Sequence, residues 1–241
     1  MKIKTAITDI KENKEYIRGE ALSSLIQDKS FVEVIYLLLR GELPSSAHKE
    51  MMNALFVAAI DHGPGTASAQ TARIVASAKN SMHTALAAGI LAMGERHGSA
   101  IEGAAQFFVD HKDEENIAGI VADLKAKKVR IPGFGHPFLS HDERSDVLFV
   151  KAEELGITGV HCRVAKDVHT ALNAISSKPL ALNIDGSMAA ILSDMGFDSA
   201  MMKGLFIIAR MPGLVGQVYE EQTNDVGIRR MSQDHIEYVG K

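Results

Sequence analysis

The sequence predicts an all-α protein, and three observations support this prediction. The chain of 241 residues is rich in alanine, leucine, isoleucine and methionine, has no tryptophan, and has only 5% aromatic residues. Alanine and unbranched side chains favour helices, and small residues let helices pack closely. Apolar residues recur at helical spacing, as at Met51, Leu55 and Ala58. Glycines and prolines divide these patterns into short segments, so we expect many helices and little strand.

The expected elements follow in order along the chain. Residues 1–19 are polar, and we expect two short extended pieces around a turn at Glu12-Asn13. Ser30 and Glu33 form a capping-box signature that opens a helix over 31–40, which Gly41 and Pro44 end. The remaining helices are expected at 46–60, 66–77, 83–94, 99–111, 116–127, 142–155, 160–176, 185–195, 198–209 and 215–221. Pro212-Gly213 is expected to separate the last two helices, and the end of the chain is expected to be irregular.

The length fits one large domain or two small ones. With roughly ten helices and short loops, we expect a single helical domain over residues 1–241. A smaller helical lobe is expected within it, over about 130–210.

Charge and composition exclude several classes of partner. The net charge of −4 and the pI of about 6.2 give no overall electrostatic reason to bind nucleic acid or an anionic membrane. The longest apolar runs are far shorter than the ~20 residues of a membrane span. The N-terminal stretch is too charged for a signal peptide. A single cysteine, Cys162, forms no internal disulfide and suits a reducing compartment, so we expect a cytoplasmic protein.

Common cofactor motifs are missing from the sequence. It contains no dinucleotide-binding or P-loop glycine motif, no paired cysteines and no His-Glu-x-x-His. Cys162 lies within a helical pattern and is interpreted as a core residue rather than a nucleophile. We therefore expect no bound metal and no bound cofactor.

The most informative stretch is RIPGFGHPFLSHDER, residues 130–144. It places His136 on a loop of glycines and prolines, where the backbone can approach a ligand closely. Lysines and arginines precede this loop, and Arg144 follows it. A titratable imidazole between cations suits an anionic ligand that needs a proton moved. The alternative is a surface turn with a solvated histidine.

Four further residues have a functional and a structural interpretation. His62 and His97 lie, like His136, beside glycine-containing breaks, where side chains can project into a shared cleft. Asp185 is an acid inside an apolar run, and it is equally well explained as a helix N-cap. Arg210 ends another apolar run, where a cation also stabilises a helix C-terminus.

Six segments in the same order resemble the citrate synthase family along nearly the whole chain. They are IRGEALSSLIQDKSFVEVIYLLLRGELP, DHGPGTASAQTARIVASA, GERHGSAIEGA, GFGHPFLSHDER, ALNIDGSMAAIL and LFIIARMPGLVGQVYEE. The resemblance implies a mostly helical homodimer, or a tetramer of two such dimers, that acts on an acyl-CoA and an α-keto acid. The coenzyme A thioester would be substrate or product rather than a bound cofactor.

The resemblance also implies roles for individual residues. Asp185 matches the general base, His97 the donor to the thioester oxygen, and His136 the donor to the keto oxygen. His62, Arg144 and Arg210 match ligands of the substrate carboxylates, which suit the bidentate guanidinium. Arg229 or Arg230 matches a late arginine that reaches the site of the partner subunit. The coenzyme A region matches Lys128, Arg130, Ile131, Pro132, Gly133, Phe134 and Gly135.

Departures from the synthase pattern favour a particular branch of the family. The chain is short, Pro137 follows the loop histidine, and Ser140 and His141 stand where a coenzyme-contacting cation is common. Gln217 replaces a histidine, and the late arginine motif is Arg229-Arg230-Met231. These features resemble the short citryl-CoA lyase branch, which includes the lyase module of ATP-citrate lyase. That branch cleaves citryl-CoA to acetyl-CoA and oxaloacetate.

Three functions follow as hypotheses. The first is cleavage of citryl-CoA or of a close 3-hydroxy-acyl-CoA. The second is a synthase that makes citrate or 2-methylcitrate from an acyl-CoA and oxaloacetate. The third is a non-catalytic helical dimer that binds coenzyme A, which would be favoured if Asp185, His97 or His136 were missing.

Overall fold

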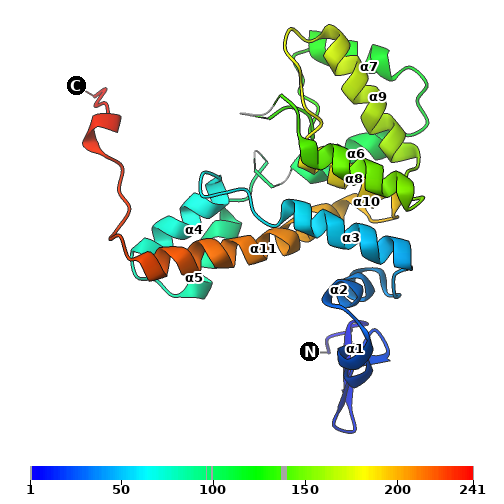
Figure 1. Ribbon diagram of the computed structural model, residues 1–241, viewed down its shortest axis with the longest axis vertical. Coiled ribbons are helices and arrows are strands. Elements are labelled where there is room, and N and C mark those ends of the chain that lie inside the picture. Colours follow the sequence, from blue (N-terminus) through cyan, green and yellow to red (C-terminus); the bar gives the residue numbers. More distant parts are fainter. Residues whose placement is uncertain (1, 96, 99, 137–139, 241) are drawn as a thin grey trace.

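The computed structural model confirms the all-α class and describes residues 2–95, 97–98, 100–136 and 140–240. Figure 1 shows the helices, which run as follows: α1 Leu22–Asp28, α2 Phe31–Arg40, α3 Ser46–Ala59, α4 Ala67–Ser77, α5 Met82–Leu91, α6 Ala100–Asp110, α7 Ile117–Ala126, α8 Glu143–Glu154, α9 Val160–Ile175, α10 Ile184–Asp194 and α11 Ser199–Asn224, with a short 3-10 turn at Gln233–His235. Pro137, which follows the loop histidine and departs from the family pattern, lies outside the described residues.

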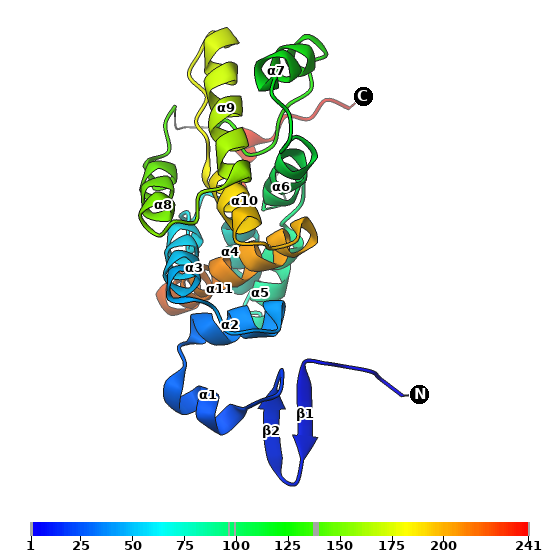
Figure 2. The same ribbon diagram turned by 90° about the vertical axis from the view of Figure 1, so that its right-hand side faces the viewer.

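A small antiparallel sheet forms the N-terminal unit. Strands β1 (Thr8–Lys11) and β2 (Lys14–Ile17) pair across the Glu12-Asn13 turn, and β3 (Glu20–Ala21) pairs with β2. The expected extended pieces are therefore confirmed, with Glu12 and Asn13 both at positive φ. The arginine at position 18 joins this unit to α2 by donating to the carbonyl of Leu38. Figure 2 shows the unit projecting below the helical body.

The expected capping box at the start of α2 is confirmed. The Ser30 hydroxyl accepts from the backbone N–H of Glu33, whose carboxylate accepts from the backbone N–H of Ser30. Gly41 ends the helix in the left-handed conformation, with φ of 79°. This geometry favours glycine, because a Cβ is strained there.

Helix α10 is the centre of the helical body, with α6, α8 and α9 around it (Figure 2). Its residues from Gly186 to Ser193 are all buried. A helix that is buried on every side needs apolar or small residues all around its circumference. This explains why the run SMAAIL shows no amphipathic pattern, and it makes the start of α10 a fixed point of the molecule.

The prediction of two helices separated at Pro212-Gly213 is wrong, because α11 is continuous through both residues. A Cβ on Gly213 would collide with the carbonyl oxygen of Ile60 and lie 2.8 Å from the Cβ of Asp61. The glycine therefore lets α11 cross the end of α3 closely. Tertiary contact overrides the local preference of this pair for a helix end.

Helices α4 and α5 pack against α11 on one side of the molecule (Figure 1). A Cβ on Gly89 of α5 would lie 3.1 Å from both the Cβ of Ala72 and the carbonyl of Ser68. Their small residues therefore serve packing within the chain. Beyond α11, residues 225–240 leave the body as an extended arm, drawn in red in Figure 1.

Candidate active site

The glycine-rich loop before His136 is fastened to the segment that enters α10. Phe134 and Leu182 form an antiparallel bridge, and the N–H of Gly135 donates to the carbonyl of Ala181 at 2.7 Å. Asn183 completes the contact, because its backbone N–H donates to Gly133 at 3.0 Å and its side-chain amide donates to Gly135 at 2.8 Å. The loop and the first turn of α10 therefore hold a fixed relative position.

Asn183, and not Asp185, is the N-cap of α10. Its side-chain oxygen accepts from the backbone N–H groups of Asp185 and Gly186 at 3.0 and 3.2 Å. The structural explanation of Asp185 as the cap is therefore wrong. Its carboxylate lies in the first turn, where the partial positive charge of a helix N-terminus favours an anion.

The carboxylate of Asp185 is desolvated and incompletely paired. Its Oδ1 is buried and has no hydrogen-bond partner among the described residues. Burial raises the pKa of Asp185 to about 6, although Arg210 and Arg144 act in the opposite direction. A carboxyl group with a pKa near neutrality can both take up and release a proton under physiological conditions.

Ser68, in the first turn of α4, fixes the ring of His97. The Ser68 hydroxyl lies 2.8 Å from Nε2 of His97, and the Ser68 backbone N–H donates to the same atom at 3.4 Å. A backbone N–H only donates, so Nε2 is the acceptor and the proton of the neutral ring is on Nδ1. Burial and the charge of Arg210 lower the pKa of His97, which keeps the ring neutral. His97 is thus a neutral donor through Nδ1.

His62 and His136 meet edge to face. Their Nε2 atoms lie 3.2 Å apart and their ring centroids 5.4 Å apart. One Nε2 must donate and the other accept, so at least one ring is neutral. Burial, followed by Arg144, lowers the pKa of His62. The contact can therefore hold or transfer a proton between the two imidazole rings.

Arg144 is oriented by Asp142. Its Nε and one terminal nitrogen donate to the two carboxylate oxygens at 2.9 and 2.7 Å. Asp142 is buried, and its side chain also caps the first turn of α8 by accepting from the backbone of Arg144. The Arg144 hydrogen bonds and charge lower the pKa of Asp142 against the effect of its burial.

Arg210 is a buried cation that no carboxylate of the described residues approaches within 4 Å. Its Nε donates to the carbonyl of Ala59 at 2.7 Å, and its guanidinium lies 4.9 Å from the ring centre of Phe206. Only 3% of the residue is exposed. Burial lowers the pKa of Arg210, while the charges of Asp61 and Asp185 raise it. Such a cation is suited to an anionic ligand.

These side chains lie within electrostatic reach of one another. The charge of Arg210 lowers the pKa of His62, His97 and Asp185, and that of Arg144 lowers the pKa of His62 and Asp185. His62 and His136 are in direct contact. The structure thus brings together six of the residues that the sequence singled out: His62, His97, His136, Arg144, Asp185 and Arg210.

Arg229 is not among them within this chain. It lies at the start of the C-terminal arm and donates from Nε and a terminal nitrogen to the carboxylate of Glu221 at 2.6 and 2.7 Å. With Arg230 it lines a separate cavity of about 520 Å³ near the loop that carries His62. Delivery of either arginine to a partner subunit stays a prediction.

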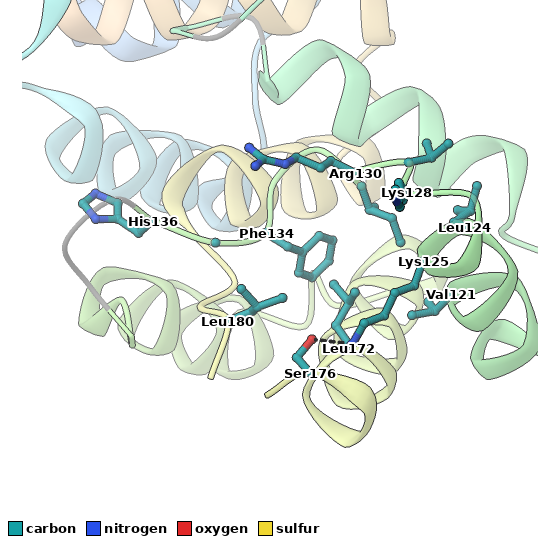
Figure 3. A pocket seen from close by; sticks show the side chains of 13 residues that line it. Val121, Leu124, Lys125, Lys128, Arg130, Phe134, His136, Leu172, Ser176 and Leu180 are labelled. Atoms are coloured by element: carbon teal, nitrogen blue, oxygen red, sulfur yellow. Dashed lines mark hydrogen bonds between the residues drawn. The ribbon is translucent and has the colours of Figure 1, made fainter. Parts of the chain in front are cut away.

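A cavity of about 640 Å³ opens beside His136 (Figure 3). Of the expected coenzyme-binding residues, Lys128, Arg130, Ile131, Phe134 and Gly135 line it, whereas Pro132 and Gly133 do not. Pro132 and Gly133 instead pack toward α6 and α10, against Gly103 and Gly186. Lys125, which belongs to the basic run that precedes the loop, also lines the cavity and donates to the carbonyl of Ile175 and to the hydroxyl of Ser176.

The cavity combines an apolar floor with a cationic rim. The floor is formed by Val121, Leu124, Phe134, Leu172 and Leu180, while Lys125, Lys128 and Arg130 supply positive charge. No acidic side chain lines it among the described residues. This combination suits an elongated ligand with an apolar part and phosphate groups.

The residues that orient these side chains could not be identified from the sequence. Ser68, Asp142 and Asn183 each hold a predicted site residue, yet each also reads as an ordinary helix-start residue. Only Asp142 carried a usable signal, because it stands two residues before Arg144 at the start of a helix.

Two further properties concern the described residues as a whole. They contain no group of three or more His, Cys, Asp and Glu side chains placed to hold a metal ion. None of the helices is long and apolar enough to span a bilayer.

Comparison with solved structures gives a close match. The fold superposes on a citryl-CoA lyase from Hydrogenobacter thermophilus with a TM-score of 0.93 and 42% identity, over 99% of this chain and 95% of the other. The similarity therefore extends over nearly the whole of both chains.

Curated relatives are more distant and longer. The ATP-citrate synthase beta chain protein 2 of Arabidopsis thaliana is 28% identical over 90% of this chain. The 2-methylcitrate synthase of Shewanella oneidensis is 28% identical over 84% of it. The chain spans 39% of the first relative and 54% of the second. Residues 44–231 match the family model described as the C-terminal domain of citrate synthase, and the chain belongs to the citrate synthase family.

Proposed function

We propose that this protein cleaves the carbon–carbon bond of citryl-CoA, or of a close 3-hydroxy-acyl-CoA, to an acyl-CoA and an α-keto acid. The observation that carries the proposal is the Asp185 carboxyl group, whose Oδ1 is buried and unpaired and whose pKa is raised to about 6. It lies in a cluster with three histidines and two arginines, which suits proton transfer on an anionic substrate.

The substrate carboxylates would be held by the cationic side of the cluster. Arg210 offers a buried guanidinium without a carboxylate partner among the described residues. Arg144 is held in a fixed orientation by Asp142. His62 adds an imidazole beside His136. Two oriented guanidinium groups recognise carboxylates through paired hydrogen bonds.

The cleavage step needs a base at the hydroxyl group and an acid at the carbon that leaves. His136 would take the proton of the substrate hydroxyl while the carbon–carbon bond breaks and the hydroxyl carbon becomes the keto carbon of the α-keto acid. The electron pair of that bond forms the enolate of the acyl-CoA. Asp185, in its protonated form, would deliver its proton to the enolate carbon.

His97 would stabilise the enolate. Because Ser68 occupies its Nε2, the Nδ1–H is the group that can donate to the thioester oxygen. A preorganised donor aimed at developing charge lowers the barrier by ~3–4 kcal/mol in comparable sites. The neutral ring suits this role, because it donates without adding charge beside Arg210.

The cavity beside His136 would bind the coenzyme A part of the substrate. Lys125, Lys128 and Arg130 would contact phosphate groups, and the apolar floor would cover the remainder. The cavity reaches His136, so a thioester bound in it would end at the catalytic cluster.

The similarity to a citryl-CoA lyase over nearly its whole length supports this direction. The similarity to a 2-methylcitrate synthase favours the second candidate, a synthase. A synthase must also hydrolyse the thioester and release coenzyme A, whereas a lyase need not.

One assay separates the candidates. The protein is incubated with citryl-CoA and, separately, with acetyl-CoA plus oxaloacetate, while thioester and free thiol are followed. A lyase converts citryl-CoA to acetyl-CoA and oxaloacetate without releasing thiol. Release of thiol from acetyl-CoA plus oxaloacetate identifies a synthase. No reaction with either substrate, together with binding of coenzyme A, favours the non-catalytic dimer.

A further inference from the structure

One face of α11 holds the end of α3 and the loop that carries His62. Residues 210, 213, 217 and 221 follow one another at helical spacing and share this face. Arg210 donates to the carbonyl of Ala59, and Gly213 allows close passage of Ile60. One turn later, the side-chain amide of Gln217 donates to Oδ2 of Asp61 at 3.0 Å.

Asp61 fixes the first turn of the His62 loop. The same Oδ2 that accepts from Gln217 also accepts from the backbone N–H of Gly63 at 3.0 Å. Gly63 has φ of 77°, a left-handed conformation that favours glycine at this turn. The Asp61 carboxylate therefore links α11 to the residues before and after His62 in the loop.

Gln217 is held in turn by Arg73 of α4. NH1 of Arg73 donates to Oε1 of Gln217 at 2.6 Å, and Nε of Arg73 pairs with Glu221 at 2.8 Å. Glu221 is 3% exposed and also accepts from Arg229 of the C-terminal arm. A continuous chain of hydrogen bonds thus connects the C-terminal arm to the His62 loop. It passes through Glu221, Arg73 and Gln217.

We infer that Gln217 is a positioning residue that holds His62 in the substrate site through Asp61, and that Arg73 and Glu221 link this position to the C-terminal arm. The inference rests on the proposed function only for the identity of the substrate. An amide suits the place, because its oxygen accepts from Arg73 while its nitrogen donates to Asp61. A carboxylate there could accept from Arg73 but would repel Asp61.

The test compares Gln217→Glu with Gln222→Glu. Gln222 lies on the same helix, and its amide donates to the carbonyl of Asn80 at 3.0 Å, so the control makes the same charge change away from Asp61. For Gln217→Glu we expect KM for citryl-CoA to rise about 10-fold, as for loss of one partly buried hydrogen bond, with a smaller change in kcat. The Kd of free coenzyme A, measured by calorimetry, should stay unchanged, because its cavity is built from other elements.

Two further variants separate positioning from folding. Gln217→His keeps one donor and one acceptor nitrogen and is expected to restore most of the affinity. Gln217→Met removes both hydrogen bonds without adding charge, and a smaller rise in KM than for Gln217→Glu is expected. Thermal unfolding of all variants shows whether the fold is retained.

Hydrogen exchange of the Gly63 amide decides the inference independently of the substrate. Faster exchange in Gln217→Glu than in the wild type and in Gln222→Glu is expected. Equal exchange, together with equal KM values in the two variants, would overturn the inference. If the wild type does not act on citryl-CoA, the proposed function fails, but the exchange measurement still tests the role of Gln217.

Discussion

At the scale of single residues, the buried position of Asp185 suits proton transfer but lowers the stability of the fold. Its pKa is about 6 in the folded chain, above the value of 3.8 for a free side chain, and burial is the main cause. The raised pKa means that folding favours the protonated form. Above pH 6 the folded protein holds an ionised carboxylate in a place that disfavours it.

Replacement of Asp185 by asparagine should therefore stabilise the fold while it strongly lowers turnover. The gain in free energy of unfolding should be about 3 kcal/mol at pH 8 and should fall toward zero as the pH drops below about 3.8, where both states are protonated. Turnover should fall by ~10²–10⁴. Denaturant unfolding at several pH values and steady-state kinetics check the two effects. A variant that is less stable at pH 8 would show that the carboxylate is a structural partner.

The backbone conformation of Lys128 also lowers the stability of the fold. It follows the C-cap of α7 with φ of 58°, where glycine is favoured. Lys128→Gly should thus raise stability by ~1 kcal/mol but weaken binding of coenzyme A several-fold. Lys79, which follows the C-cap of α4 with φ of 65° away from this cavity, is the matched control. Lys79→Gly should leave coenzyme A affinity unchanged, and calorimetry of both variants tests the difference.

At the scale of elements, the loop that carries His136 is in contact with helix α10 at two glycines. A Cβ on Gly186 would lie 2.5 Å from the carbonyl oxygen of Gly133, and one on Gly133 would lie 2.7 Å from the Cα of Gly186. The loop can approach the first turn of α10 only because neither residue has a side chain. This contact sets the distance between the His136 loop and Asp185.

The substitution Gly186→Ala should disrupt this contact. We expect a loss of ~2–3 kcal/mol in the free energy of unfolding and at least a tenfold loss of turnover, because the loop must move. Gly204→Ala in α11 is the matched control, since nothing lies within 4 Å of its added Cβ, and it should stabilise the helix by up to ~1 kcal/mol. Unfolding curves of both variants give the comparison. Equal stability changes would show that the two glycines are not in required contact.

Local signals predicted most elements well. The capping box of Ser30 and Glu33 and the turn at Glu12-Asn13 depend on neighbouring residues, and both are confirmed. The continuity of α11 could not be predicted, because it depends on Gly213 meeting Ile60, more than 150 positions earlier in the sequence. A contact between residues distant in sequence therefore determines that α11 continues through Gly213.

At the scale of the whole molecule, the site is assembled from loops and helix starts that are distant in sequence. The histidines and Asp185 could be singled out by their place at breaks and by resemblance. Their orienting partners could not, because Ser68 holds His97 and Asn183 holds the His136 loop only once the helices have packed. The pairing of Arg229 with Glu221 was likewise hidden from the sequence.

We expect a homodimer, with α4 and α5 at its interface. Each of the two helices carries an exposed apolar side chain, with Ile74 of α4 49% and Leu91 of α5 85% accessible. Leu91→Glu should weaken the dimer, whereas Ile26→Glu, at a residue 74% exposed on α1, should not. Sedimentation at micromolar concentration measures both. A monomeric wild type would contradict the expectation.

In the proposed reaction, Asp185 delivers a proton to the enolate carbon during cleavage. Cleavage of citryl-CoA in D₂O, with mass spectrometry of the acetyl-CoA formed, tests this claim. We predict that the wild type gives acetyl-CoA with a single deuterium in its methyl group and no free coenzyme A, and that Asp185→Asn gives almost none. Cleavage by Asp185→Asn at a rate near that of the wild type would contradict the claim.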